Sequence, residues 1–289
     1  MFGTTLVVSR FGVDQFAPTA YIALRLAIAS FCFVLMYTFR IGNRKWPQGK
    51  SLWGRGFLMG VFGTALPMTG IVSSLQYLSS GLVSILITVS PAITVLLAHF
   101  FLDDEPLSRR KSGGVLLALS GAILLTVLGE TGLPNIEQGN LLGYGLVLGG
   151  MVSGSAATIY ARKFMQTDNI IDVTGIRMFA GMAVVFPLSF LLGEFDLSAV
   201  NNQGLMALFF AAIVGTFLGF LLSFHNIQKF GATAAVMTSY VVPVVAGIIG
   251  LLFLGEQITW GMFSGILLIG IGVWIISARQ SQTNTHAIH

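Results

Sequence analysis

The chain has 289 residues, of which 55% are hydrophobic and only 9% are charged, and its mean hydropathy is +0.85. These values exclude an ordinary soluble protein, and the apolar runs leave no room for an extramembrane enzyme domain. The net charge of +4 comes largely from Lys and Arg in short loops, so it indicates membrane topology rather than a nucleic-acid partner.

We expect an all-α integral membrane protein with ten transmembrane helices, because each span needs about 20 mostly apolar residues. The first apolar run, Met1–Ser9, is too short, so we expect the missing part of this truncated helix to lie upstream. The other nine spans are expected near residues 18–39, 52–75, 78–102, 113–128, 141–160, 170–192, 204–224, 231–254 and 259–277.

The sequence contains an internal repeat. A shift of 152 positions carries Arg25 onto Arg177, Thr64 onto Thr216 and Pro91 onto Pro243; with one residue fewer, Glu105 falls on Glu256. The expected organisation is a first repeat at 1–129, a linker at 130–139, a second repeat at 140–278 and a tail at 279–289. Five spans per copy is an odd number, so the two copies are expected to be inverted in the membrane.

Positive residues are concentrated in alternate loops, which predicts a multi-pass membrane protein with both termini in the cytoplasm. Of the 15 Lys and Arg residues, 12 follow even-numbered spans or lie in the tail: Arg40, Arg44, Lys45, Lys50, Arg55, Arg109, Arg110, Lys111, Arg162, Lys163, Lys229 and Arg279.

The spacing within each copy resembles the EamA-like domain of the drug/metabolite transporter superfamily. In the second copy the resemblance rests on Pro243, Gly255, Glu256, Gly265 and Gly272; in the first it rests on Arg25, Pro91, Glu105 and Gly114. The first copy departs from the pattern in having Asp103 and Asp104 before Glu105. The resemblance implies a ten-helix carrier in the inner membrane for small organic metabolites such as amino acids, often an exporter.

In such carriers the substrate site lies between the halves near mid-depth. Polar or aromatic residues and prolines in the matched central spans are therefore candidate substrate-binding residues: Thr64, Ser84, Thr88, Ser90, Pro91, Thr216, Thr238, Ser239, Tyr240 and Pro243. Tyr240 is the strongest single candidate, since it offers both a ring and a donor. Alternatively, the hydroxyls bond to their own helices and the prolines only kink them. Many hydroxyls and few charges favour a small, neutral or zwitterionic substrate.

Arg25 and Arg177 are the charged residues inside spans. They are expected either to gate the carrier or contact an anion, because intramembrane charge is usually functional, or to snorkel to the headgroups or cap a neighbouring helix end. Glu105 and Glu256 are expected to cap the helix that follows each of them, with proton coupling as the alternative.

Glycines at four-residue spacing, among them Gly56 with Gly60 and Gly145 with Gly149, are expected at close helix contacts. No metal or cofactor is expected, since no ligand spacing is present. The chain is expected to be a transporter and not an enzyme, as a monomer or homodimer with the bilayer and a small molecule as partners. The alternative is a non-transporting membrane scaffold or a membrane-embedded enzyme.

Overall fold

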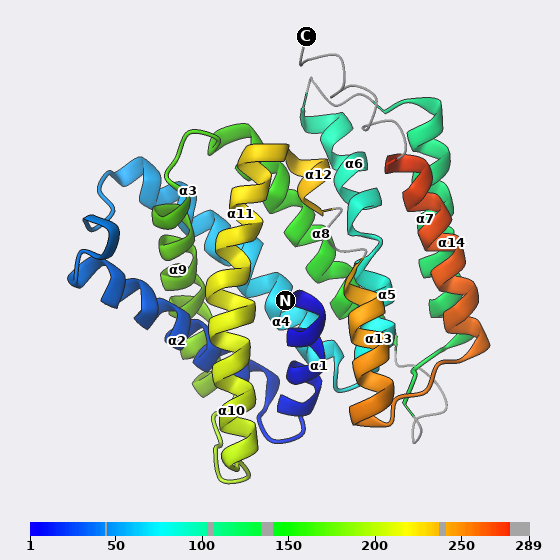
Figure 1. Ribbon diagram of the computed structural model, residues 1–289, viewed down its shortest axis with the longest axis horizontal. Helices are drawn as coiled ribbons and strands as arrows, with labels where there is room; N and C mark the ends of the chain where they lie inside the picture. The colour runs from blue at the N-terminus through cyan, green and yellow to red at the C-terminus, as the bar shows by residue number, and fades with distance from the viewer. Residues whose placement is uncertain (44, 103–106, 134–140, 237–240, 278–289) are drawn as a thin grey trace.

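The computed structural model describes residues 1–43, 45–102, 107–133, 141–236 and 241–277. Within these ranges every regular element is a helix (Figure 1), as the composition predicts. In chain order they are α1 (Phe2–Gly12), α2 (Pro18–Thr38), the 3-10 turn η1 (Ile41–Asn43), α3 (Lys50–Gly60), the π-helix η2 (Val61–Ala65), α4 (Leu66–Ser74), α5 (Ser80–Ile87), α6 (Ser90–Phe101), α7 (Arg109–Leu128), α8 (Leu141–Phe164), α9 (Ile170–Leu191), α10 (Asn202–Phe210), the π-helix η3 (Ala211–Leu218), α11 (Gly219–Phe230), α12 (Ala232–Val236), α13 (Val241–Leu254) and α14 (Trp260–Ser277).

The helix starts follow from local sequence signals. Pro18 occupies the first turn of α2, where its missing N–H is not needed. Ser79, Ser108 and Asn201 each accept a hydrogen bond from the backbone N–H three residues further on, which satisfies one free donor of the following helix.

The start predicted for the fifth span is wrong by four residues, which belong to the helix and not to the loop before it. Because Ser108 caps the helix at this point, α7 starts at Arg109, and the basic trio Arg109, Arg110 and Lys111 occupies its first turn. The predicted helix began four residues later, at Gly113, because the apolar run starts there.

Eight continuous helical stretches are long and apolar enough to cross a membrane: Pro18–Thr38, Lys50–Ser74, Ser80–Phe101, Arg109–Leu128, Leu141–Phe164, Ile170–Leu191, Asn202–Phe230 and Trp260–Ser277. The first and ninth predicted spans correspond to shorter helices, since α1 has 11 residues and α13 has 14. The described residues therefore contain a helix at each of the ten predicted places, but eight of them have full membrane length.

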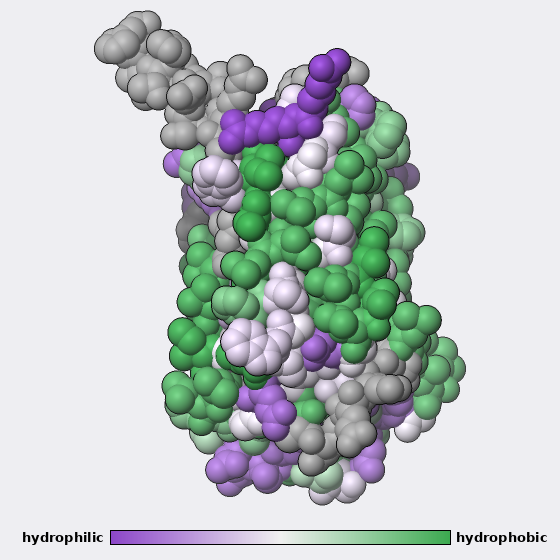
Figure 2. Space-filling model, turned by 90° about the vertical axis from the view of Figure 1, so that its right-hand side faces the viewer, coloured by the Kyte–Doolittle hydropathy of each residue, from purple (hydrophilic) through white to green (hydrophobic). Residues whose placement is uncertain are grey.

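The outer surface matches a bilayer environment. Figure 2 shows a wide hydrophobic band on one face, with hydrophilic residues gathered toward both ends. Large apolar side chains of α7 and α14 are exposed, among them Leu116 at 70% and Trp274 at 66%. Exposure of this extent would be unfavourable in water, and it is expected where side chains face lipid.

Helices that the repeat matches in sequence pack against each other. The second helix of the first half, α2, packs along its counterpart α9, and α7 packs along its counterpart α14. Other contacts also join the two halves, because α1 packs on α13 while α8 packs on α4 and α6. Much of the core is thus built between the two halves, in addition to contacts within each half.

Glycines permit the closest of these contacts. A Cβ placed on Gly114 of α7 would lie 2.5 Å from the carbonyl oxygen of Gly272 in α14. Gly56 is equally close to the side chain of Ile176, as predicted for a glycine at a helix contact. The same prediction is wrong for Gly145 and Gly149, where no atom lies within 4 Å of the added Cβ.

Candidate functional site

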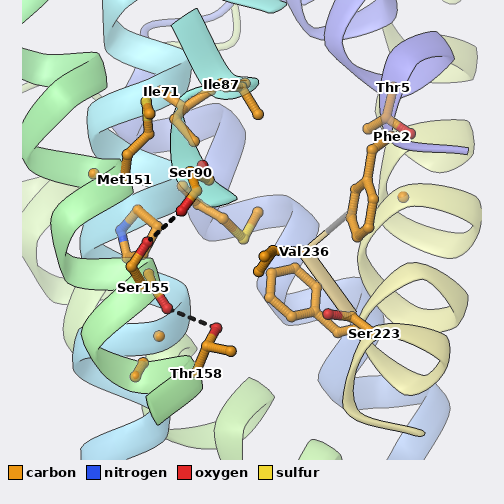
Figure 3. A pocket seen from close by; sticks show the side chains of 18 of the residues that line it. Phe2, Thr5, Ile71, Ile87, Ser90, Met151, Ser155, Thr158, Ser223 and Val236 are labelled. Carbon is orange, nitrogen blue, oxygen red and sulfur yellow. Dashed lines mark hydrogen bonds between the residues drawn. The ribbon is translucent and has the colours of Figure 1, made fainter. Parts of the chain in front are cut away.

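A cavity of about 280 Å³ is lined by residues from both halves of the chain. Figure 3 shows Ser90, Ser155 and Thr158 on one wall, with Phe2 and Ser223 on the opposite wall. The first group comes from α6 and α8, and the second from α1 and α11. The cavity therefore lies where the interleaved helices of the two halves meet.

Arg25 of α2 lines this cavity, and only 5% of its surface is exposed. Its Nε and Nη2 atoms donate to the hydroxyl oxygen of Thr216 at 3.2 and 3.0 Å. Its Nη1 atom donates to Ser9 at 2.9 Å, and its guanidinium lies 5.5 Å from the ring centre of Tyr21. Neutral oxygens and an aromatic ring therefore hold the cation in place.

Arg177 of α9 lines the same cavity and is 4% exposed. Its Nε donates to the Thr64 hydroxyl at 3.2 Å, and its Nη2 donates to the Gly63 carbonyl oxygen at 2.9 Å. The ring of Phe220 lies 4.9 Å from the guanidinium carbon, at a distance suited to a cation–π contact.

Each of the two arginines bonds to a threonine of the other half. Arg25 of the first repeat bonds to Thr216 of the second, and Arg177 of the second bonds to Thr64 of the first. The repeat matches these arginines with each other, and likewise the threonines. The two hydrogen-bonded pairs, Arg25–Thr216 and Arg177–Thr64, are therefore equivalent under the sequence repeat, and each pair joins one half to the other.

Both threonines lie in π-helical segments, Thr64 in η2 and Thr216 in η3. A π-segment widens the helix by one residue per turn and leaves local backbone groups less tightly paired, and such segments occur frequently at functional sites. The Thr216 hydroxyl donates to the carbonyl of Ala211, five residues earlier, at 3.1 Å. It can therefore accept from Arg25 with its lone pairs.

The alternative that the two arginines snorkel to the headgroups is wrong, because both side chains are buried in the protein. Arg25 and Arg177 each lie seven residues after the first residue of their helices, α2 and α9, and this count alone places them at shallow depth. The count did not reveal that neighbouring helices cover them there.

The predicted hydroxyl candidates divide into two groups. Ser90 lines the cavity, while Thr64 and Thr216 reach it through the arginines that they bind. Ser84 and Thr88 do not line it; they donate to the carbonyls of Gly81 and Ile85 in their own helix, which was the alternative prediction. Thr238, Ser239 and Tyr240 lie outside the described residues.

The two predicted prolines lie in different surroundings. Pro91 is buried in the first turn of α6, just after Thr88 and Val89 interrupt the span between α5 and α6. Pro243 lines a second cavity of about 210 Å³ and does not line the central one. Neither of the two predicted prolines lines the central cavity.

Several cavity residues were missed by the sequence analysis, notably Ser155 and Thr158 of α8 and Ser223 of α11. Ser155 accepts a hydrogen bond from Thr94 at 3.1 Å, which joins α8 to α6. A usable signal was the run of small residues Ser153–Ala157, since small side chains leave space beside a helix.

Glu256 acts as a cap, but not for the helix predicted. Its buried carboxylate accepts hydrogen bonds from the backbone N–H of Ser80 at 2.7 Å and of Gly81 at 2.9 Å, and from the Ser80 hydroxyl at 2.9 Å. These groups belong to the start of α5 in the other half, whereas the sequence analysis expected the helix that follows Glu256, now α14. Glu105 lies outside the described residues.

The described part of the chain contains no cluster of three His, Cys, Asp or Glu side chains that could hold a metal ion. The chemistry available at the cavity is accordingly that of two guanidinium groups, several hydroxyls and an apolar wall.

Comparison with known proteins gives consistent results. The EamA-like transporter family model matches residues 1–127 and 141–278. An uncharacterized transporter of Archaeoglobus fulgidus is 24% identical over 96% of this chain and 95% of its own length. The uncharacterized transporter YoaV of Bacillus subtilis is 27% identical over 95% and 92%. A probable amino-acid metabolite efflux pump of Salmonella typhimurium is 23% identical over 95% and 90%.

A solved structure, titled only as the crystal structure of a protein, superposes with a TM-score of 0.68 and covers 96% of both chains. Its 18% sequence identity shows a shared fold and nothing further. Since the family model accounts for nearly the whole chain in two copies, the chain belongs to the EamA-like transporter family.

Proposed function

We propose that the chain is a secondary transporter that exports small organic metabolites, amino acids among them, by alternating access between two inverted halves. It acts in the inner membrane with both termini in the cytoplasm, as a monomer or homodimer. It needs no cofactor and catalyses no reaction.

The observation that carries this proposal is that Arg25 and Arg177 line one central cavity and that each bonds to a threonine of the other half. Inverted-repeat carriers hold substrate at the interface of their halves, and rocking of one half against the other exposes it to alternate sides. Each crossing pair joins a helix of one half to a π-segment of the other. Such contacts are suited to change when the halves move.

A membrane scaffold would explain the burial of apolar surface but not a cavity whose walls carry two cations. A membrane-embedded enzyme would need a nucleophile with a base, or a metal set. The hydroxyls at the cavity have no His, Asp or Glu among their hydrogen-bond partners in the described residues. Transport therefore remains the better supported function.

An efflux screen tests the proposal. Cells expressing the chain are compared with vector controls by metabolite profiling of the medium, and we expect at least one metabolite to accumulate severalfold faster. Gly154→Leu is expected to abolish this export, because Gly154 lines the cavity and has only the Pro67 ring nearby, at 3.7 Å, so the larger side chain occupies the cavity without a backbone clash.

Gly149→Leu is the matched control. It lies on the same helix, α8, but nothing lies within 4 Å of its added Cβ, so export should be unchanged. Equal abundance of both variants in the membrane is checked by immunoblot. A medium whose composition is the same with and without the chain would contradict transport and favour the scaffold.

A further inference from the structure

The central cavity has an unbalanced positive charge. Arg25 and Arg177 both line it, and no Asp or Glu is present among its described lining residues. The two ion pairs found in the described residues, Arg10–Asp14 and Arg55–Asp168, lie elsewhere. Burying a charge without a counter-charge is unfavourable by several kcal/mol, so a site of this kind favours an occupant that brings negative charge.

The guanidinium groups also retain free donors. A guanidinium has five N–H groups. Those of Arg177 have two partners within the described residues, the Thr64 hydroxyl and the Gly63 carbonyl, and its Nη1 atom has none. Two parallel N–H groups of a guanidinium match the two oxygens of a carboxylate, and such charge-assisted bonds are about twice as strong as neutral ones.

The rest of the wall limits the remainder of the ligand. Met59, Met68, Met151 and Phe220 give most of the lining an apolar character, and hydroxyls such as those of Ser155 and Thr158 are the other polar side chains near them. A volume of about 280 Å³ is at the lower end of ordinary ligand pockets, which suits a small molecule with a short apolar body.

We propose that the central cavity binds a small organic carboxylate, with Arg25 and Arg177 as the groups that recognise its negative charge. This inference rests on the proposed transport function and narrows its substrate class. The sequence favoured a neutral or zwitterionic substrate because charge is scarce along the spans; of these two, only a zwitterion carries the carboxylate proposed here. The competing explanation is that both arginines only hold the halves together through Thr216 and Thr64, and then the cavity has no preference for charge.

Binding measurements on the purified full chain in lipid nanodiscs separate the two explanations. The probes are succinate, phenylacetate and 4-methylpentanoate, each compared with its own primary amide, which has nearly the same shape and no charge. We expect at least one carboxylate to bind at least tenfold more tightly than its amide, as measured by isothermal titration at neutral pH. Arg177→Gln should weaken that binding at least tenfold, while Arg177→Lys, which keeps the charge, restores part of it.

Arg110→Gln is the control for loss of a positive charge, since Arg110 is an exposed residue at the start of α7; it should bind the carboxylate as the unaltered chain does. If Arg177→Gln does not fold, the comparison of carboxylate with amide on the unaltered chain still decides. The proposal is overturned if none of the three carboxylates binds, or if the amides bind as tightly.

Failure of the carboxylate-site proposal can be distinguished from failure of the transport proposal. Export of a neutral metabolite, with no preference for carboxylates in nanodiscs, overturns the carboxylate site and leaves transport intact. Carboxylate binding with no export of any metabolite supports the site and contradicts transport.

Discussion

At the scale of single residues, Glu256 joins the two halves of the chain by hydrogen bonds. One carboxylate accepts three hydrogen bonds from Ser80 and Gly81 and neutralises the positive end of α5. Both of its oxygens accept hydrogen bonds and it is 5% exposed, so water cannot replace these bonds readily. The loop between α13 and α14 is thereby fixed to the first turn of α5.

Glu256→Gln should destabilise the protein by about 2 kcal/mol, since hydrogen bonds to a charged group contribute about 1.5–3 kcal/mol and the amide has a single acceptor oxygen. The measurement is the midpoint of thermal unfolding in nanodiscs, which we expect to fall by several degrees. Asp14→Asn is the control, because Asp14 is 59% exposed and its pair with Arg10 contributes under about 1 kcal/mol. Equal midpoints for the two variants would contradict the capping role.

At the scale of helices, the positions of most spans could be predicted from the sequence. The π-helical segments within two of the spans could not. Apolar runs and capping residues locate α8, α9 and α14 to within a few residues. The π-segments η2 and η3 left no trace in the pattern, because one additional residue in a turn depends on how the helix packs against its neighbours.

The contact of α7 with α14 gives a paired test on adjacent residues. Gly114→Ala places a methyl group 2.5 Å from a backbone carbonyl oxygen of α14, so the helices must separate, and we expect a loss of about 1–3 kcal/mol. Gly113→Ala meets nothing within 4 Å and should be neutral or stabilising by about 0.5–1 kcal/mol. Midpoints of thermal unfolding measure both changes. A destabilised Gly113→Ala, or a neutral Gly114→Ala, would show that the close approach does not hold these helices together.

At the scale of the whole molecule, the sequence repeat identifies which residues correspond but not which ones touch. It matches Arg25 with Arg177 and Thr64 with Thr216, all four of which belong to the site. It could not predict that each arginine bonds to the threonine of the other half, since these partners are 191 and 113 residues apart. Contacts at such separations depend on how the halves interleave, which no single helix pattern specifies.

The orientation in the membrane is tested with reporter fusions. A fusion at Gly132, between the halves, should place alkaline phosphatase outside the cytoplasm and give an active enzyme, while a fusion at Gln282 should be inactive. Green fluorescent protein at the same positions should give the opposite result. Cytoplasmic signals from both positions would contradict an odd number of spans in each half, which the inverted arrangement requires.

Because each arginine bonds to a threonine of the other half, the two pairs become complete at different times during synthesis, although the two halves correspond in sequence. Arg25 precedes Thr216 by 191 residues. At about 5–20 residues per second of synthesis, roughly 10–40 s pass before the ribosome makes its partner. Arg177 is made after Thr64 and can bond to it as soon as α9 is inserted. Within the first half, the described contacts of Arg25 are the Ser9 hydroxyl and the Tyr21 ring. Ser9 is matched in the second half by Ala161, which has no hydroxyl. We therefore expect the first half to depend on Ser9 and Tyr21 to hold Arg25 until the second half is made.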